Sequence, residues 1–434
     1  MTEGTFDYRC SHNTTAVREV HSIDYVLFAA GFSLMCFGLV MVFSAGISES
    51  LKAGDYMFYF KRQLVWTLLS LLILLGLIGF DISRIKRLIK PLVIMTLLLL
   101  VFLLIPSLIK FGFVHPSRRW FRFGGFGFQP SEFAKIVVII YLASILTKKG
   151  EELNDFYRGF LPPFIIVTLF SILIFLEPDF STAFMIFFIS LMMFFIAGIR
   201  AISLISLVFV SIPALYLMIS EKSYRRERIV GFLNPWMDPT DKGYQIIQSF
   251  KAFALGGLAG AGLGKSIQKM KYLPIPHTDF IFAIIAEETG FIGVLFVIAL
   301  YIIIAYRGYT IAKYQKERFD FYLAFGLTSL ITWQAVFNIA VVTGLLPSTG
   351  ISLPFLSYGG SSMVANSVIL GLLLNLSRNK NVETQTGMVK PLDIDTAEIN
   401  ETNPITFVND RFCNSDENGA SKDRGSDFGI SYLK

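Results

Sequence analysis

Pro274-Ile-Pro-His-Thr-Asp-Phe-Ile-Phe-Ala-Ile-Ile-Ala-Glu-Glu288 is the stretch of sequence that decides the fold. A polar approach with two prolines enters an apolar run that carries three carboxylates: Asp279, Glu287 and Glu288. An ionisable side chain at or below the rim of a membrane helix is costly, so its presence points by default to a function. The stretch therefore predicts a membrane helix with a site at its entrance.

The composition around this stretch is that of an integral membrane protein. Of the 434 residues, 54% are apolar and only 16% are charged. The formal net charge of +6 does not indicate a nucleic-acid partner, because the basic residues fall in loops between apolar runs. The three cysteines are too scattered for a disulfide framework or a metal site. The first apolar run begins only after about two dozen mixed residues, so we expect no cleavable signal, and the first helix should direct insertion.

The long apolar runs predict membrane-spanning helices. About 20 apolar residues cross a bilayer, and unalternating runs of this length satisfy their backbone groups in lipid as helices. We therefore predict an all-α polytopic membrane protein with about ten transmembrane helices, at Tyr25–Ser44, Leu64–Phe80, Pro91–Ile109, Pro130–Thr147, Phe160–Leu176, Phe180–Ile199, Ala201–Ser220, Asp279–Tyr306, Phe319–Val342 and Leu353–Leu376. Residues 24–380 form the predicted membrane domain. Residues 1–23 form a predicted cytoplasmic segment, and residues 381–434 a disordered cytoplasmic tail.

Basic residues in short loops predict the orientation, because such residues are enriched on the cytoplasmic side. One side carries Arg84, Lys86, Arg87, Lys90, Lys148, Lys149, Arg158, Arg307, Lys313, Lys316, Arg318, Arg378 and Lys380. Both termini are therefore predicted to be cytoplasmic, with a long extracytoplasmic loop at about residues 221–276 between helices 7 and 8.

Two loops on the predicted outer side are basic despite this preference. They contain Lys110, Arg118, Arg119 and Arg122 in one, and Lys222, Arg225, Arg226, Arg228, Lys242, Lys251, Lys265, Lys269 and Lys271 in the other. Bases kept on that side suggest an anionic ligand. The alternative is that translocated loops tolerate charge once the flanking helices fix the topology.

A glycine-rich run in the long loop, Gly256 to Ser266, ends like a nucleotide-binding loop. The match fails because Ala259 stands where the first glycine is needed, and no buried strand precedes the run. We interpret the glycines as allowing close backbone approach, either between short helices lying on the bilayer or around a diphosphate.

Several motifs along the chain resemble those of the SEDS family of bacterial shape, division and sporulation proteins. They are Arg119-Trp120, Gln129-Pro-Ser-Glu-Phe-Ala-Lys135, Glu177-Pro-Asp179, Asn234-Pro-Trp-Met-Asp-Pro239, Gly243-Tyr-Gln-Ile-Ile-Gln-Ser249, Gly262-Leu-Gly264, Tyr272-Leu-Pro274, His277-Thr-Asp-Phe-Ile-Phe-Ala283, Glu287-Glu288, Gly344-Leu-Leu-Pro347 and Leu353-Pro-Phe-Leu-Ser-Tyr-Gly-Gly-Ser-Ser362. The similarity covers roughly residues 24 to 380 and is closer to the division branch than to the elongation branch. Ile275 stands where the family usually has glutamate, and Ser348-Thr349 where division members commonly have Thr-Lys.

The resemblance implies a peptidoglycan glycosyltransferase that polymerises lipid II at the outer face of the bacterial cytoplasmic membrane, at the division septum. It implies a class B penicillin-binding transpeptidase and other division proteins as partners, together with membrane lipids. The family's essential outer aspartate falls on Asp279, its pair at the start of the fourth helix on Glu132 and Lys135, and its outer arginine and tryptophan on Arg119 and Trp120.

The residues themselves suggest how such chemistry would proceed. Asp279 is the candidate catalytic base, because partial desolvation at the rim would raise its pKa toward the working pH. Stabilising a helix N-terminus is its alternative role. Arg119, Arg122, Lys265 and Lys269 are candidates for the diphosphate, while Trp120 would pack on sugar or prenyl chain.

The remaining candidates have supporting or open roles. Glu132 and Lys135 are three residues apart on one helix face, so they form either an intrahelical ion pair or a group that binds phosphate or tunes Asp279. We expect Glu287 or Glu288 to pair with a base in the interior, and His277 to be structural. A magnesium or manganese ion shared by Asp279 and the diphosphate is possible.

Three other functions remain open at this point. A lipid II flippase would use a groove lined by Glu132, Lys135, Glu177 and Asp179. An elongation-type paralogue would perform the same chemistry in cell shape. A non-catalytic scaffold for division proteins would tolerate the loss of Asp279.

Overall fold

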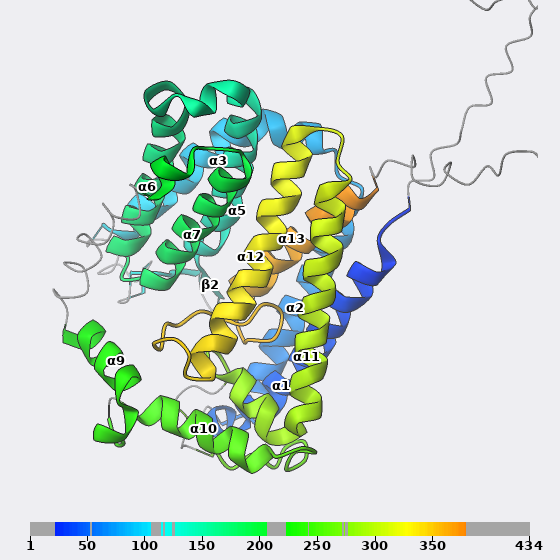
Figure 1. Ribbon diagram of the computed structural model, residues 1–434. Coiled ribbons are helices and arrows are strands. Elements are labelled where there is room, and N and C mark those ends of the chain that lie inside the picture. Colours follow the sequence, from blue (N-terminus) through cyan, green and yellow to red (C-terminus); the bar gives the residue numbers. More distant parts are fainter. Residues whose placement is uncertain are drawn as a thin grey trace, which may run out of the picture. The chain divides into compact units, whose positions relative to one another are not determined.

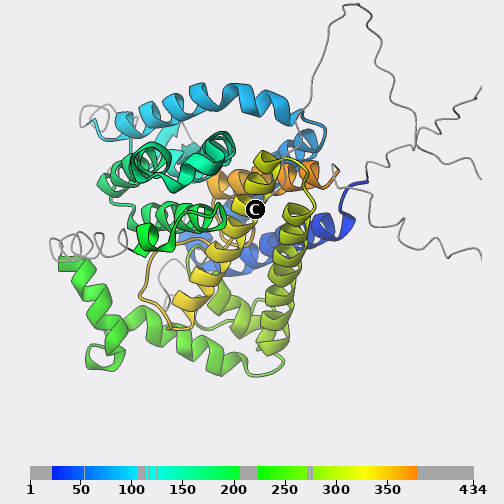
Figure 2. The same ribbon diagram turned by 45° about the horizontal axis from the view of Figure 1, so that its top comes forward.

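The computed structural model describes residues 22–52, 54–105, 114–115, 118–123, 126–205, 223–241, 243–270, 273 and 277–378. The predicted segment 1–23 lies almost entirely outside these residues, and the predicted tail 381–434 lies wholly outside them. The described part is mostly helical (Figures 1 and 2). Its helices are α1 Tyr25–Lys52, α2 Phe58–Ile78, α3 Ile82–Leu103, α5 Pro130–Lys149, α6 Leu161–Leu176, α7 Phe180–Ile196, α9 Ser223–Leu233, α10 Tyr244–Gly256, α11 Ile281–Lys313, α12 Arg318–Val342 and α13 Gly360–Ser377. Short helical turns cover Gly150–Asn154, Phe156–Phe160 and Pro235–Met237.

A small antiparallel hairpin is the only sheet among the described residues. Strand β1 (Phe121–Phe123) pairs with β2 (Phe126–Phe128), so that Phe121 lies opposite Phe128. The hairpin leads directly into α5, which begins with Pro130. A proline is well suited to the first helical position because its missing N–H would lack a partner there. The hairpin and this helix start together fix the entrance of α5.

Seven helical segments of the described residues are long and apolar enough to cross a membrane: α1, α2, α5, α6 together with the helical turn Phe156–Phe160 that precedes it, α11, α12 and α13. The prediction of about ten spans is therefore supported only in part. Helix α7 has 17 residues, and α3 carries Arg84, Lys86, Arg87 and Lys90 in its first turns. The predicted span at Ala201–Ser220 lies mostly outside the described residues, which show helix only over 201–205.

Several predicted helix boundaries were wrong. Helix α1 ends at Lys52 and not at Ser44, α11 ends at Lys313 and not at Tyr306, and three helix starts differ by six residues or more. Helix α3 begins at Ile82, because Asp81 caps it by accepting a hydrogen bond from the Ser83 N–H, and Pro91 lies inside the helix. Helix α2 begins at Phe58, six residues earlier than predicted. Helix α13 begins at Gly360 and not at Leu353, because residues 353–359 form turns.

Helix α11 is broken at Gly290, where φ is +67°. The segment from Gly256 to Gly262 lies against this break, and the backbone N–H groups of Ala261 and Gly262 donate to the carbonyls of Glu287 and Glu288. A Cβ atom on Gly256 would lie 2.0 Å from the Ala286 carbonyl oxygen. The glycines thus allow close backbone approach, as predicted, and the contact is with α11.

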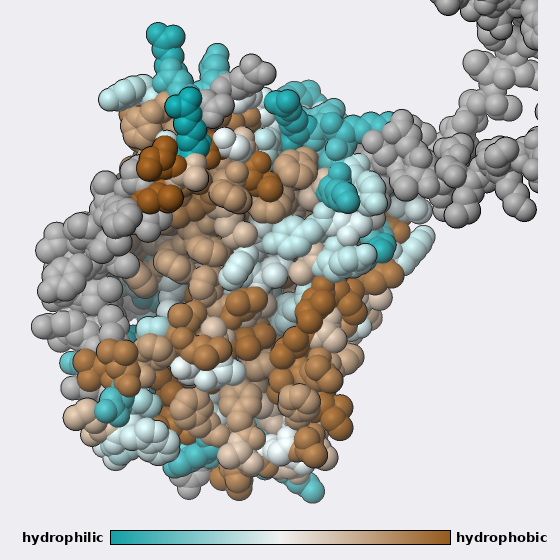
Figure 3. Space-filling view, viewed as in Figure 1, coloured by the Kyte–Doolittle hydropathy of each residue, from teal (hydrophilic) through white to brown (hydrophobic). Residues whose placement is uncertain are grey.

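The buried core is apolar and continuous through the long helices. Figure 3 shows apolar side chains across their flank, whereas hydrophilic side chains gather mainly at the end that carries the connection from α11 to α12. We call this the basic end. The other end, where α11 begins and where α10 packs beside it, is called the site end (Figure 1).

Candidate functional site

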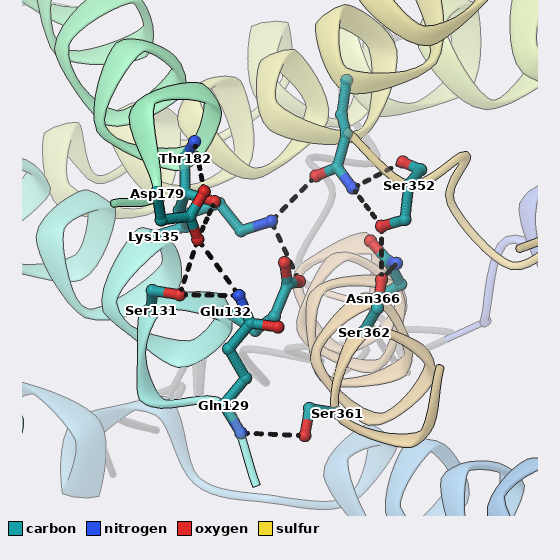
Figure 4. Close-up of polar contacts among 11 residues, drawn as sticks. Gln129, Ser131, Glu132, Lys135, Asp179, Thr182, Ser352, Ser361, Ser362 and Asn366 are labelled. Carbon is teal, nitrogen blue, oxygen red and sulfur yellow. Dashed lines mark hydrogen bonds and ion pairs between the residues drawn. The ribbon is translucent and has the colours of Figure 1, made fainter. Parts of the chain in front are cut away.

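Several chain segments meet at the site end through hydrogen bonds between distant residues. The start of α5 is tied to the start of α13, because the Gln129 N–H donates to the Ser361 hydroxyl over 3.1 Å. The Gln129 side-chain amide also donates to the Asp179 carboxylate at the start of α7, over 3.1 Å. These contacts, drawn in Figure 4, hold the helix ends around one polar region.

Asp279 lies in a turn directly before α11. The Asn338 side-chain amide of α12 donates to its backbone carbonyl over 2.9 Å and to the Ile351 carbonyl over 2.7 Å. Asn338 therefore holds the aspartate turn against the loop between α12 and α13. The prediction that the helix itself starts at Asp279 was wrong by two residues, since α11 begins at Ile281.

The Asp279 carboxylate is half-buried and makes no hydrogen bond or ion pair with any described residue. Burial raises the pKa of Asp279 to about 6, while the positive charges of Arg228 and Arg119 act to lower it. Such a group changes protonation just below neutral pH and has free lone pairs. It therefore has the properties of a general base.

His277 supports the aspartate turn from behind. Its buried ring lies 4.5 Å from the Tyr59 ring and 5.4 Å from the Tyr358 ring, measured between centroids. Burial lowers the pKa of His277 to about 4, so the ring is neutral at physiological pH. The Tyr358 N–H donates to the His277 carbonyl over 2.9 Å. These contacts are those of a structural residue.

Glu132 and Lys135 form a buried ion pair on α5, with 3.0 Å between the Lys135 Nζ and the Glu132 carboxylate. The same Nζ donates to the Gln334 side-chain carbonyl of α12 over 3.0 Å. Gln334 in turn donates to the Ser352 carbonyl, and the Ser352 hydroxyl contacts that of Ser362 on α13 (Figure 4). The pair is thus one end of a polar chain that links α5, α12 and α13.

Glu177 and Asp179 flank the turn between α6 and α7. Asp179 caps α7 by accepting hydrogen bonds from the backbone N–H and the hydroxyl of Thr182. Glu177 is fully buried, and neither of its carboxylate oxygens has a hydrogen-bond partner among the described residues. Burial, together with the nearby Asp179 charge, raises the pKa of Glu177 to about 9, while the Arg119 charge acts to lower it.

Arg119, the arginine of the predicted Arg119-Trp120 pair, lies beside this turn. Arg119 donates from Nε to the Glu177 carbonyl over 3.3 Å and also bonds to the Pro178 carbonyl. Trp120 packs near Gly127, where an added Cβ atom would lie 3.2 Å from the indole ring. Arg122 is exposed on strand β1. Of the three, Arg119 has a charge that acts on Asp279.

Glu287 and Glu288 lie in a second polar group near the break in α11. The Lys269 Nζ lies 2.7 Å from the Glu288 carboxylate, which also accepts a hydrogen bond from the Ser44 hydroxyl of α1. Glu287 accepts hydrogen bonds from the Ser266 hydroxyl and from the backbone N–H of Ile267 and Gln268.

These contacts separate the predicted basic candidates of the long loop. Lys269 is 2% exposed and its ammonium faces Glu288, so the structure places it with the carboxylate pair and not with Asp279. Lys269 is thus the interior base that pairs with one of the two glutamates, and its role at the diphosphate stays a prediction. Lys265 is exposed on the surface of the same loop.

Sequence reasoning missed three residues of this site. Arg228, on α9, donates to the Ser348 carbonyl over 3.2 Å, and its charge acts on Asp279. It was one of many bases in the loop, and nothing in the sequence singled it out. Gln334 and Asn338 lie within a predicted membrane span, and the sequence analysis did not single them out. Two amides four residues apart in a mostly apolar helix could have indicated a polar site there.

The described residues include no group of three His, Cys, Asp or Glu side chains that could hold a metal ion. Asp279 is a single hard oxygen ligand of the kind that Mg²⁺ accepts together with phosphate oxygens. An ion at Asp279 would therefore be held together with the phosphate oxygens of the substrate.

The fold and the site together define a multi-pass helical membrane protein with a half-buried carboxylate at one end of its helices, on which the charges of two arginines act. The chain belongs to the family described as "Cell cycle protein", whose model, named for FtsW, RodA and SpoVE, matches residues 24–382. This confirms the resemblance to the SEDS family.

Curated relatives agree with this assignment. The chain is 40% identical to "Probable peptidoglycan glycosyltransferase FtsW" of Geobacter sulfurreducens, over 83% of this chain and 96% of the relative. It is also 40% identical to "Stage V sporulation protein E" of Bacillus subtilis, over 82% of this chain and 97% of the relative.

Solved structures share the fold. One, described as "Structural coordination of polymerization and crosslinking by a peptidoglycan synthase complex", is 28% identical with a TM-score of 0.65, and covers 82% of this chain and 98% of that one. The rod shape determining protein RodA of Thermus thermophilus is 26% identical with a TM-score of 0.61, over 83% and 98%.

Proposed function

We propose that the chain is a peptidoglycan glycosyltransferase that polymerises lipid II into glycan strands. The observation that carries this proposal is the Asp279 carboxylate, which is half-buried, has no partner among the described residues and feels the positive charges of Arg228 and Arg119. The names of the curated relatives, which include probable peptidoglycan glycosyltransferases, support the same reaction.

Asp279 acts as the general base in this proposal. The acceptor hydroxyl loses its proton to the Asp279 carboxylate while its oxygen bonds to the anomeric carbon of the donor sugar. The bond from that carbon to the lipid diphosphate breaks, and the diphosphate leaves with the electron pair. Because burial raises the pKa of Asp279 to about 6, the carboxylate is ionised at neutral pH and yet basic enough to accept a proton.

The leaving diphosphate requires positive charge close to the base. Arg119 and Arg228 are the guanidinium groups whose charges reach Asp279, and Arg122 and Lys265 are exposed bases that can extend this field. Lys135 carries a buried ammonium at the edge of the same region. Trp120 offers an apolar ring to a sugar or to the prenyl chain.

A magnesium or manganese ion belongs to the proposal as a cofactor held by Asp279 and the diphosphate together. Bound there, such an ion would neutralise charge on the leaving group. Asp279 would then have to serve the ion and the acceptor hydroxyl in turn, and Arg119 would orient the diphosphate.

The proposed orientation places the basic end in the cytoplasm and the site end outside. Arg84, Lys86, Lys148, Arg307 and Arg378 lie at the basic end, as expected for cytoplasmic loops. This orientation puts both ends of residues 24–380 in the cytoplasm and the loop of about 221–276 outside. Both ends lie on the same side because the proposed number of spans, about ten, is even. The division septum is the proposed location, by analogy with the FtsW-named relatives.

The proposed partner is a class B penicillin-binding transpeptidase, together with other division proteins. The solved peptidoglycan synthase complex, whose printed description joins polymerisation to crosslinking, supports a crosslinking partner. The transpeptidase would join peptides on the glycan strands that this chain extends.

The test is polymerisation of purified lipid II by the purified protein, with and without a transpeptidase partner and a divalent cation. We expect glycan strands from the wild type and none from Asp279→Asn, with unchanged folding and partner binding. Asp241→Asn is the matched control, because Asp241 is an exposed acid of the same loop. Full activity of Asp279→Asn would remove Asp279 as the base.

The same variant separates the other functions. A flippase would lose translocation of lipid II in Asp279→Asn while the purified protein made no glycan in either form. A scaffold would tolerate the substitution in both assays and in cells.

A further inference from the structure

Two amide side chains lie one turn apart on the same face of α12, within a mostly apolar helix. Gln334 and Asn338 are each 1% exposed, and residues four apart on a helix are neighbours. Buried amides are costly unless every polar atom is paired. Asn338 holds the Asp279 turn through two backbone carbonyls, as described above, which leaves the role of Gln334 to be explained.

The chemistry of its partners fixes how the Gln334 amide is oriented. Lys135 Nζ can only donate and lies 3.0 Å from Oε1, whereas the Ser352 carbonyl can only accept and lies 3.0 Å from Nε2. Reversing the amide would place donor against donor and acceptor against acceptor. Gln334 therefore always presents its carbonyl to Lys135.

This contact directs the Lys135 ammonium without neutralising it. Two of its three N–H groups are used by Glu132 and Gln334, and the described residues provide no partner for the third. Glu132 balances the charge, whereas the neutral Gln334 carbonyl only orients it. Figure 4 shows Lys135 and Glu132 on α5 facing Ser352 and Ser362 across the polar region.

We propose that Gln334 is a positioning residue that aims the third N–H of Lys135 at an anionic oxygen of the lipid diphosphate. The proposal rests on the proposed function and deepens it, because it assigns the substrate's diphosphate to Lys135 as well as to the arginines. Gln334 does not touch the substrate. It acts through Lys135, and its second bond ties this ammonium to the loop at Ser352.

A purely structural role is the competing explanation. Gln334 would then only tether the Ser352 loop to α12, and its loss would weaken the site whether or not Lys135 was present. The two roles differ in a double-mutant cycle, because residues that act through one another give non-additive effects.

The experiment measures the Kd for lipid II in the full-length protein, with Asp279→Asn throughout to prevent turnover. Gln334→Met keeps the side-chain length and removes both hydrogen bonds, and we expect it to raise the Kd about tenfold. Lys135→Met should raise the Kd by at least as much. The double variant should bind like Lys135→Met alone.

Thr328→Val is the matched control, since Thr328 is a buried residue of α12 whose hydroxyl has no hydrogen-bond partner among the described residues. It should leave the Kd unchanged. If Gln334→Met does not fold, Gln334→Leu serves instead. It also removes both hydrogen bonds and adds no charge, so its effect on the Kd should likewise depend on the presence of Lys135.

The cycle has only two outcomes. The change in log Kd caused by the Gln334 substitution is compared with Lys135 present and with Lys135→Met. If this change falls by more than half in the Lys135→Met background, the positioning role stands. If it falls by half or less, or if the substitution has no effect with Lys135 intact, the role is overturned. A wild type that makes no glycan from lipid II would instead overturn the proposed function, which is measured separately.

Discussion

Lys269 provides the sharpest test of how this structure is held together. Its ammonium lies 2.7 Å from the Glu288 carboxylate, and the two side chains are 1% and 0% exposed. Lys269→Met removes the charge and keeps the length of the side chain. Glu288 would then remain buried with only the Ser44 hydroxyl and the Ser266 N–H as partners.

The magnitude follows from this geometry. Removing one partner of a buried ion pair costs about 3–5 kcal/mol, because the other charge stays buried without compensation. The two remaining hydrogen bonds to Glu288 put the expected loss at the lower end, about 3 kcal/mol. The double variant Lys269→Met/Glu288→Gln carries no such charge, and it should recover most of the loss.

Equilibrium denaturation in mixed detergent micelles measures the free energy of unfolding for both variants. Lys61→Met is the control, because Lys61 and Asp55 also lie 2.8 Å apart but are 63% and 39% exposed, and solvent screens such a pair. The reasoning fails if Lys269→Met unfolds like the wild type. If that stable variant also lost lipid II binding, Lys269 would be a substrate residue after all.

Three further predictions concern Asp279 and the loop against α11. The rate of polymerisation should rise with pH through about 6, because burial raises the pKa of Asp279 and the base works only when deprotonated. About one tenth of the maximal rate should remain at pH 5. A flat profile of initial rate between pH 5 and 7 would exclude Asp279 as the titrating base. Arg228→Ala should move the midpoint of that profile upward, since the guanidinium lowers the Asp279 pKa, and an unmoved midpoint would mean that the charge does not act there. Gly260→Ala should destabilise the fold by more than Gly264→Ala in the same denaturation assay, because both glycines have φ near +80° but only at Gly260 would the new Cβ lie 2.2 Å from the Glu288 carbonyl. Equal losses for the two variants would contradict the close contact.

The positions of the long helices were largely predictable because a membrane span is decided by its own residues. Arg318–Val342 and Leu161–Leu176 fall within one residue of their predicted limits. The predicted helix boundaries were wrong where a capping residue or a turn, and not the apolar run, sets the end of the helix. The Asp81 cap starts α3 ahead of its apolar run, and the turns at 353–359 are as apolar as the helix that follows them.

The site was predictable only in the residues that the sequence makes conspicuous. An acid at the mouth of an apolar run identified Asp279, and two adjacent glutamates within the run indicated an internal base. The sequence did not say which base. Lys265 and Lys269 stand in the same loop, yet one is exposed and the other is buried against Glu288.

By itself, the sequence determined the helical membrane class and the acid beside α11, because run length and the cost of a charge near lipid depend on local residues alone. The tertiary structure alone decided which charges face Asp279, where Lys269 points, and how the Gln334 amide joins Lys135 to Ser352. Those facts depend on tertiary contacts between separate segments: Lys135 and Gln334 are 199 residues apart in the chain, and Lys269 reaches Glu288 across 19 residues.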